Sequence, residues 1–323
     1  MGTCVGVDIG ATNIRVILAS KTAIIDRKSE KTVKKGENLA VSQQIIRMTT
    51  DLMDKHNTPQ SSLKGIGVSA CGPFLNERTI ARSPNLCKDN TWQEIPIIDP
   101  LERHFGSHLD YKMRNDCVAA VWAEHMFGSA QNIANCLYIT VSSGVGGGFV
   151  LDGQLIVGKR GNAGHVGHQI LKMDGPMCNC GQRGCLEALV AGTYLEQRLK
   201  RESLCDSPKE LFQMARDNHP RAQEIVAEII QYLSIGIINA ICISDVQIVI
   251  LGGSIITNNV DLLLNPIREY VKAYSFSSLT QGTQIVTPKL GEYVGEIGGL
   301  ALVMPGDWIS EWRKIRPWKI LMI

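Results

Sequence analysis

A histidine and three cysteines lie close together between residues 161 and 187. Cys178, Cys180 and Cys185 form the pattern C-x-C-G-x-x-G-C, and His168 precedes the first of them by ten residues. Thiolate and imidazole groups in this number suit a tetrahedral Zn²⁺ site with four protein ligands. A disulfide pair is the alternative use of the same cysteines. We expect structural zinc, because this ligand set is larger than a single C-x-x-C pair.

Two further polar residues, His165 and Glu187, flank the cysteine cluster in the sequence. Gly181 and Gly184 lie between the cysteines and allow the loop to turn back on itself. A metal that fixes such a loop would also hold the flanking polar side chains rigidly. The stretch is therefore a candidate small-molecule site.

Asp8, Gly10 and Thr12 lie in a turn between two apolar runs near the start of the chain. Gly10 would let a phosphate approach the backbone, Thr12 offers a hydroxyl, and Asp8 can hold Mg²⁺. The same residue types also form ordinary hairpin turns, which remains the alternative.

Residues 135–150 read NCLYITVSSGVGGGFV and repeat the opening stretch in outline, with Ser143 and Gly144 at the bend. This similarity predicts an internal duplication in which two glycine-rich bends hold a polyphosphate. A flexible glycine loop is the alternative. Gly252 and Gly253 follow another buried run and would suit a nucleotide close to the start of a helix.

Asn115 and Asp116 stand between an expected strand and an expected helix. The carboxyl ends of strands are where open α/β sheets place their chemistry, so Asp116 is a candidate catalytic acid or base. Asp116 could equally be the N-cap of the helix. Asn85, in the polar turn Ser-Pro-Asn-Leu, could contact a ligand or simply form the turn.

These candidate residues must be positioned by strands that end beside them and by helices that cover the sheets. Alternating or continuous apolar runs predict strands at 3–7, 14–19, 64–70, 109–113, 246–251 and 283–288. Helical periodicity predicts helices at 39–54, 99–104, 117–127, 186–199, 207–217, 221–243, 261–273 and 295–304. The Trp-containing tail, residues 308–323, is expected to dock on the body.

The composition fits a globular protein with a sizeable core. The chain has 323 residues, 44% of them hydrophobic and 20% charged, with a net charge of +2. This charge argues against a broad nucleic-acid surface. The seven cysteines outside the cluster are scattered among apolar neighbours, which is typical of reduced thiols. We see no signal peptide or membrane span, and we expect a cytoplasmic protein.

The order of these motifs resembles the ROK (repressor, open reading frame, kinase) family of sugar kinases. An acidic Gly-Thr hairpin is followed by Asn-Asp before a helix, T-V-S-S-G-V-G-G-G, the His-Cys cluster with its trailing Glu187, and L-G-G-S. The resemblance covers the chain from Val5 to about Leu302. It implies an α/β, two-lobed actin-like ATPase (ribonuclease H-like) fold, with a mixed sheet flanked by helices in each lobe.

The resemblance also implies a division of the chain and a set of partners. Residues 1–116 would form an N-terminal lobe for sugar and phosphate, rejoined by the helix at 295–323. Residues 117–294 would form a C-terminal lobe with the nucleotide site and the zinc loop. The cofactors would be ATP, Mg²⁺ and structural Zn²⁺. The protein would be a homodimer or higher homo-oligomer that binds neither nucleic acid nor membrane.

The resemblance implies transfer of the γ-phosphate of ATP to a hexose hydroxyl, usually the 6-hydroxyl. Asp116 matches the catalytic base of the family. The sugar-contacting positions of the family correspond to Asn85, Asn115, His168 and Glu187 in this chain. Its zinc ligands correspond to His168, Cys178, Cys180 and Cys185. The two phosphate loops match Asp8, Gly10, Thr12, Ser143 and Gly144, and the nucleoside side matches Gly252 and Gly253.

The sequence departs from the usual family pattern at one position. The family usually has G-E-x-G-H where this chain has Gly-His-Val-Gly-His, so that His165 replaces a sugar-binding glutamate. Because histidine both donates and accepts hydrogen bonds, we expect altered recognition near C1 or C2 of the sugar. The surrounding motifs look like those of N-acetylmannosamine kinases, with glucokinases or broad-specificity hexokinases as the alternative.

Two readings from other functional classes remain. The repressor branch of the family carries a helix-turn-helix before the kinase-like body, and here the first phosphate hairpin already begins at Asp8. A sugar-binding protein without catalysis would not need Asp116 together with both glycine-rich bends. We therefore expect an enzyme.

Overall fold

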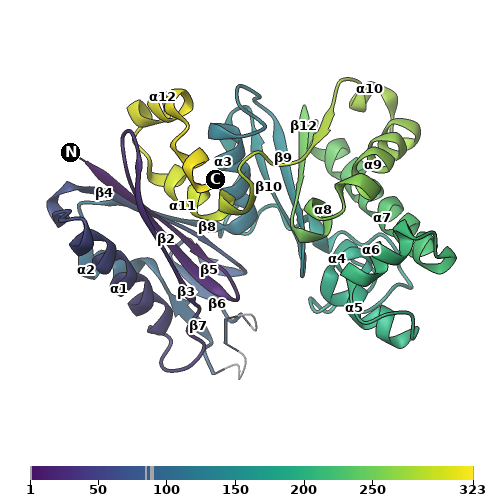
Figure 1. Cartoon of the computed structure of the whole chain (residues 1–323), viewed down its shortest axis with the longest axis horizontal. Coiled ribbons are helices and arrows are strands. Elements are labelled where there is room, and N and C mark those ends of the chain that lie inside the picture. The colour runs from purple at the N-terminus through teal and green to yellow at the C-terminus, as the bar shows by residue number, and fades with distance from the viewer. Residues whose placement is uncertain (1, 84–85, 88–90, 323) are drawn as a thin grey trace. The chain divides into compact units, whose positions relative to one another are not determined.

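The computed structural model describes residues 2–83, 86–87 and 91–322. Contacts within the chain divide it into two compact units. The first unit comprises Met1–Gln131, Leu155–Ala163 and Lys289–Ile323, and the second comprises Asn132–Gln154 and Gly164–Pro288. Each unit contains its own five-stranded sheet with helices packed on it (Figure 1).

The boundary between the units lies further along the chain than residue 116, where the sequence placed it. Helix α3 (Asp116–Phe127) belongs to the first unit, because it packs against helix α11 (Val294–Val303) of the same unit. A Cβ at Gly298 would lie only 2.8 Å from the backbone oxygen of Ala119, so the two helices are in close contact.

The sheet of the first unit has the order β3-β2-β1-β4-β8. Strand β1 pairs antiparallel with β2 and parallel with β4, and β4 pairs parallel with β8. The strands are β1 (Thr3–Ile9), β2 (Asn13–Ser20), β3 (Ile24–Lys31), β4 (Leu63–Ala70) and β8 (Asp110–Asn115). A small second sheet contains β5 (Phe74–Asn76), β6 (Thr79–Ala81) and β7 (Glu94–Pro96).

Side chains alternate across the first sheet as the sequence predicts. Ile14, Val16 and Leu18 belong to a core that includes helices α1 (Ala40–Lys55) and α2 (Ile98–Phe105). Ile17 belongs instead to the core on the opposite face, with α11. Both faces of the sheet are therefore covered by helices (Figure 1).

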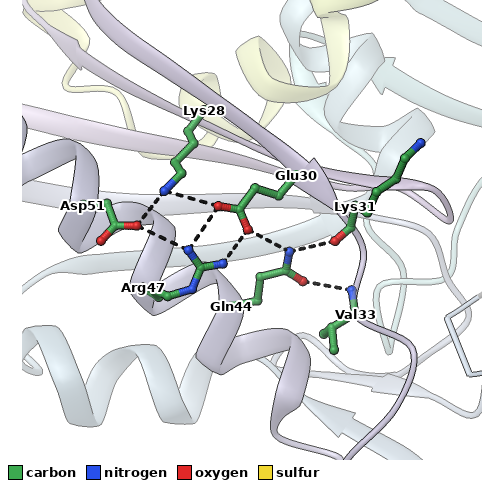
Figure 2. A network of polar contacts seen from close by, with 7 residues as sticks. All are labelled: Lys28, Glu30, Lys31, Val33, Gln44, Arg47 and Asp51. Atoms are coloured by element: carbon green, nitrogen blue, oxygen red, sulfur yellow. Dashed lines mark hydrogen bonds and ion pairs between the residues drawn. The ribbon is translucent and has the colours of Figure 1, made fainter.

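Strand β3 was missed in the sequence, because its residues are IIDRKSEK and show no apolar alternation. Lys28 and Glu30 pair with helix α1 (Figure 2), whereas Arg27 pairs with Glu296 of helix α11. Lys28 donates to Asp51 at 2.6 Å and Arg47 pairs with Glu30. Gln44 joins the loop after β3, accepting the N–H of Val33 and donating to the carbonyl of Lys31, both at 2.9 Å.

Helix α11 lies close to the sheet because its glycines remove side chains from the contact. A Cβ at Gly67 of β4 would lie 1.9 Å from the carbonyl oxygen of Gly299. Only glycine fits at such a distance.

The Trp-containing tail docks on the first unit, as expected. It forms helix α12 (Gly306–Ile315) and the 3₁₀ helix η4 (Pro317–Met322). Trp308, Trp312 and Trp318 are buried, and the last two lie 5.7 and 5.1 Å from the ring of Phe127.

The sheet of the second unit has the order β11-β10-β9-β12-β13. Strand β9 pairs antiparallel with β10 and parallel with β12, which is the arrangement of β1, β2 and β4 in the first unit. This shared topology supports the predicted duplication. The strands are β9 (Cys136–Val141), β10 (Val145–Leu151), β11 (Gln154–Leu155), β12 (Ile248–Gly252) and β13 (Gln284–Val286).

In the second unit one expected helix is broken, and the short helix at 277–280 was not expected. The single helix expected over 186–199 is broken at Ala191, because the N–H of Gly192 donates to the carbonyl of Ser142 at 2.7 Å. The helices are α4 (Leu186–Val190), α5 (Gly192–Arg201), α6 (Pro208–Arg216), α7 (Pro220–Ser244), α8 (Ser254–Thr257), α9 (Val260–Tyr274) and α10 (Ser277–Thr280).

Helix α7 is the one described helix that is long and apolar enough to cross a membrane by length and composition alone. Half of its apolar window is buried within the structure. Leu233, Ile237 and Ile241 on this helix belong to the core of the second unit. This burial is typical of a core helix of a folded domain.

Candidate active site

The parallel strands of the first unit end at one row of residues. Ile9 of β1 pairs with Ala70 of β4, and Ala70 pairs with Asn115 of β8. Gly10 and Asp116, which follow two of these residues, therefore lie at the same edge of the sheet. This is the edge at which α/β sheets collect their functional groups.

Asn115 and Asp116 form the start of helix α3. Asn115 occupies the N-cap position that the sequence offered to Asp116, and its Oδ1 accepts the N–H of Cys117 at 3.0 Å. Asp116 Oδ1 accepts the same N–H at 2.8 Å. The cap is therefore Asn115, which leaves the carboxylate of Asp116 as the first acidic group of the helix.

Burial and the nearby charge of Asp8 together raise the pKa of Asp116 to about 6, against the N–H bond from Cys117, which lowers it. A carboxylate with a pKa in this range can both bind and release a proton near neutral pH. This pKa lies in the range that a general base needs near neutral pH.

Asp8 is paired with a residue that sequence reasoning missed. Its Oδ2 accepts a hydrogen bond from Arg15 Nη1 at 2.9 Å, and its Oδ1 accepts one from Ser69 Oγ at 3.3 Å. Asp8 and Arg15 face each other across the β1–β2 pair, which is the signal that could have identified the ion pair. Burial nevertheless raises the pKa of Asp8, so a further cation near it would be favourable.

The turn between β1 and β2 is held by its own backbone and by Thr32. The N–H of Gly10 donates to the carbonyl of Asn13 at 3.0 Å, and Thr32 Oγ1 donates to the carbonyl of Gly10 at 2.7 Å. Thr12 is exposed at this turn. An exposed residue at this turn leaves room for a ligand.

The second glycine-rich bend, at Ser143 and Gly144, is joined to Glu187. Glu187 Oε2 accepts the N–H of Val145 at 2.9 Å. A Cβ at Gly144 would lie 2.7 Å from the same oxygen, so a larger residue there would displace this carboxylate. Ser143 is exposed and lies beside a cavity of the second unit.

The predicted zinc ligands converge. The ligand atoms of His168, Cys178, Cys180 and Cys185 all lie within 4.8 Å of one another. Cys180 Sγ is 3.6 Å from Cys185 Sγ, and Cys178 Sγ is 3.7 Å from His168 Nδ1. A disulfide needs sulfurs about 2.05 Å apart, whereas sulfurs that share a tetrahedral Zn²⁺ lie about 3.8 Å apart. The donor set and its spacing fit zinc rather than a disulfide.

The loop that carries these cysteines is fixed by backbone geometry. Gly184 has φ +68°, and a Cβ there would lie 1.5 Å from the carbonyl oxygen of Lys172. The hydroxyl of Tyr194 accepts the N–H of Asn179 at 2.7 Å and lies 3.7 Å from Cys178 Sγ. Tyr194 therefore supports the loop from helix α5.

His168 and His165 lie on either side of a short 3₁₀ turn, η2 (Val166–His168). Since His168 turns Nδ1 toward the cysteines, its Nε2 is available to another partner. The ring of His165 lies 5.8 Å from that of His168. Burial lowers the pKa of His165, and the nearby His168 lowers it further while Glu187 opposes the shift.

Gly252 and Gly253 end strand β12 and are both required by packing. A Cβ at Gly252 would lie 2.1 Å from the hydroxyl of Tyr138, and one at Gly253 would lie 2.4 Å from the carbonyl of Val141. Ser254, which begins helix α8, lies 3.1 Å from Ser142, Oγ to Oγ. These contacts bring the end of β12 beside the β9–β10 bend.

A cavity of about 730 Å³ opens next to this bend within the second unit. Most of its walls were not identified in the sequence, because they come from helices α5, α6 and α8, far apart in the chain. The polar residues around it include Ser143, Thr193, Lys209, Ser254 and Asn258. Its volume is in the range of small-molecule and cofactor sites. Asn85, the remaining sugar-contact candidate, lies outside the described residues.

Comparisons with known proteins agree with the motifs. The model of the ROK family matches residues 4–305. The chain belongs to the ROK family. It is 29% identical to a glucokinase of Thermotoga maritima, covering 93% of this chain and 96% of that protein. It is also 29% identical to an N-acetylmannosamine kinase of Haemophilus influenzae, covering 91% and 93%.

A solved ROK hexokinase from Thermus thermophilus is 28% identical, with a TM-score of 0.77 and coverage of 93% of this chain and 97% of that one. The predicted actin-like ATPase fold is therefore confirmed. The ROK protein is a sugar kinase, as expected. Relatives with two different sugar specificities match it equally in identity.

Proposed function

We propose that this ROK kinase transfers the γ-phosphate of ATP to the 6-hydroxyl of a hexose or N-acetylhexosamine, with N-acetyl-D-mannosamine preferred and Asp116 as the general base. The observation that carries the proposal is the half-buried carboxylate of Asp116 at the start of α3, with a pKa raised to about 6. A sugar hydroxyl is a poor nucleophile at neutral pH, so its proton must be taken as the new bond forms.

Asp116 would accept the proton of the 6-hydroxyl, and Asn115 would bind a neighbouring hydroxyl while it caps the helix. The cap bond from Cys117 holds Asp116 in place. General-base assistance of this kind contributes roughly 10² to 10⁴ in rate. The remaining rate enhancement would come from alignment and from neutralisation of phosphate charge.

Each glycine-rich bend would contact phosphate within its own unit. Gly10 and Thr12 would do so in the first unit, and Ser143 and Gly144 in the second. Asp8 fits a Mg²⁺ site, because its buried carboxylate is only partly balanced by Arg15. Mg²⁺ would supply charge neutralisation at the β- and γ-phosphates. The cavity beside Ser143 would take the nucleoside, with Gly252 and Gly253 shaping its approach.

The zinc would be structural. His168, Cys178, Cys180 and Cys185 provide four protein ligands and leave no open position for substrate or water. Its role would be to fix the loop, so that His168 Nε2 and Glu187 present a rigid surface to the sugar. His165 and Asn85 would complete the sugar contacts.

His165 favours N-acetylmannosamine over glucose, because this chain lacks the glutamate that the family usually places there. A neutral imidazole, consistent with the lowered pKa of His165, can donate to an amide carbonyl or accept from a hydroxyl. Glucokinase activity, or a broad hexose range, is the alternative function, and the equal match to a glucokinase supports keeping it.

The test is a side-by-side measurement of kcat/KM with ATP and N-acetylmannosamine, glucose, N-acetylglucosamine and mannose. We expect the highest value for N-acetylmannosamine. A higher value for glucose would replace the preferred sugar by the alternative. No turnover with any of these sugars would contradict the kinase itself. We further propose a cytoplasmic homodimer or higher oligomer, which analytical ultracentrifugation checks.

A further inference from the structure

Glu124, two turns after Asp116 on helix α3, is a fully buried acid with an unusual set of partners. Its side chain is 0% exposed and accepts three backbone N–H groups. Oε2 accepts from Ser129 at 2.6 Å and from Lys289 at 3.2 Å, and Oε1 accepts from Leu290 at 2.8 Å. The side chain of Glu124 on α3 is thus a common hydrogen-bond acceptor for two separate backbone segments.

These two segments are the points at which the chain leaves and re-enters the first unit. The chain passes into the second unit after Gln131 and returns at Lys289. Ser129 precedes the exit by two residues, while Lys289 and Leu290 are the first residues after the return. A single carboxylate therefore fixes both connecting segments to the helix that begins with Asp116.

These contacts require an acid at position 124 and a glycine at position 128. An amide has one acceptor oxygen, so glutamine could not accept all three N–H groups and would turn an NH₂ group toward one of them. A Cβ at Gly128 would lie 2.0 Å from Glu124 Oε2. No ion pair involves Glu124 in the described part of the chain. Backbone N–H groups are therefore the hydrogen-bond partners of this buried carboxyl group.

We propose that Glu124 is a positioning residue for phosphoryl transfer, which fixes both connecting segments to the helix of the general base. This inference rests on the proposed role of Asp116. Displacement of either segment would shift α3 and so move Asp116 relative to the sugar hydroxyl. An error of about 1 Å at a reacting group costs up to roughly 10² in rate.

The experiment compares Glu124→Gln with the wild type and with a matched control, Trp122→Phe. Trp122 lies on the same helix, and its indole N–H donates to the carbonyl of Ala301 at 3.2 Å, which lies outside the two connecting segments. For Glu124→Gln we expect kcat to fall roughly tenfold to a hundredfold, with the KM for sugar within about threefold. The amides of Ser129, Lys289 and Leu290 should exchange hydrogen faster. Trp122→Phe should lower the Tm and leave kcat and these amides nearly unchanged.

A kcat of Glu124→Gln within about twofold of the wild type, together with faster amide exchange, would overturn the inference and leave a purely structural acid. If Glu124→Gln does not fold, Gly128→Ala disturbs the same carboxylate from the connecting segment and should show the same loss of kcat. Unchanged kcat in that variant would also overturn the inference. A wild type without activity would instead contradict the proposed function. Amide exchange would still show whether Glu124 holds the two connecting segments on α3.

Discussion

Glu187 accepts the backbone N–H of Val145 at 2.9 Å, and this bond joins the cysteine loop to the glycine-rich bend between β9 and β10. The other carboxylate oxygen of Glu187 lies 3.8 Å from Cys178 Sγ. The candidate zinc site and the candidate phosphate bend are therefore connected through one side chain. Damage to the zinc site should weaken both the fold of the loop and the binding of substrates.

Replacement of one metal ligand tests the structural role of the zinc. Cys180→Ser should lower bound zinc well below one ion per chain and lower the Tm by roughly 5 °C, because a lost ligand removes part of the metal's folding energy. Metal analysis and calorimetry check both values. Cys242→Ser is the control, since Cys242 is exposed and lies outside the cluster. Full zinc and full stability in Cys180→Ser would reject the site.

The buried acid Glu296 should make stability depend on pH. Its side chain pairs with Arg27 at 2.7 Å, and burial raises its pKa from 4.5 to about 7. Because the folded state binds this proton more tightly, the stabilisation is complete below pH 4.5 and is lost as the pH rises through 7. The loss amounts to about 2 to 3 kcal/mol.

Position 296 cannot titrate in Glu296→Gln. Between pH 5 and pH 8 the Tm of this variant should therefore fall less than the Tm of the wild type, and the two falls should differ by roughly 5 °C. Calorimetry at several pH values compares the two proteins. Asp8 and Asp116 titrate in both, so the difference between the proteins isolates Glu296. If the Tm values of the two proteins change in parallel with pH, Glu296 is not the group responsible.

His165 should control the choice of sugar. His165→Glu restores the residue that the family usually has, and we expect the ratio of kcat/KM for glucose over N-acetylmannosamine to rise about tenfold, equivalent to about 1.4 kcal/mol. His219→Gln, at an exposed position before helix α7, is the control and should keep the wild-type ratio. An unchanged ratio in His165→Glu would place sugar selection elsewhere.

The pKa of Asp116 predicts the acid side of the pH–rate profile. Because its carboxyl must be ionised to accept a proton, kcat/KM should decrease below about pH 6, tenfold for each further unit. Steady-state rates between pH 5 and pH 8.5 at saturating ATP and Mg²⁺ measure this. A rate that stays constant down to pH 5 would be inconsistent with a base of this pKa.

Local patterns were sufficient for the parts of the structure that local chemistry decides. The β1–β2 hairpin, helix α3 and the ligand cluster follow from apolar alternation, from a capped apolar run and from cysteine spacing. Strand β3 was not predictable in this way, because its charged residues Lys28 and Glu30 are stabilised by helix α1, which is distant in the sequence (Figure 2).

Long-range contacts decide the rest of the site. The break at Ala191 depends on a bond from Gly192 to Ser142, fifty residues away in the chain. The cavity beside Ser143 is assembled from three helices, and no single segment carries its pattern. The acceptor role of Glu124 appears only once residues 289 and 290 are placed beside it, and they are distant from it in the sequence.

The most direct test of the account is Asp116→Asn, measured for sugar binding by calorimetry and for turnover with ATP. The amide keeps the size of the side chain but cannot take the proton of the sugar hydroxyl. We predict a Kd for the sugar within about threefold of the wild type and a kcat lower by roughly 10² to 10⁴. A near-normal kcat in this variant would contradict the assignment of Asp116 as the general base.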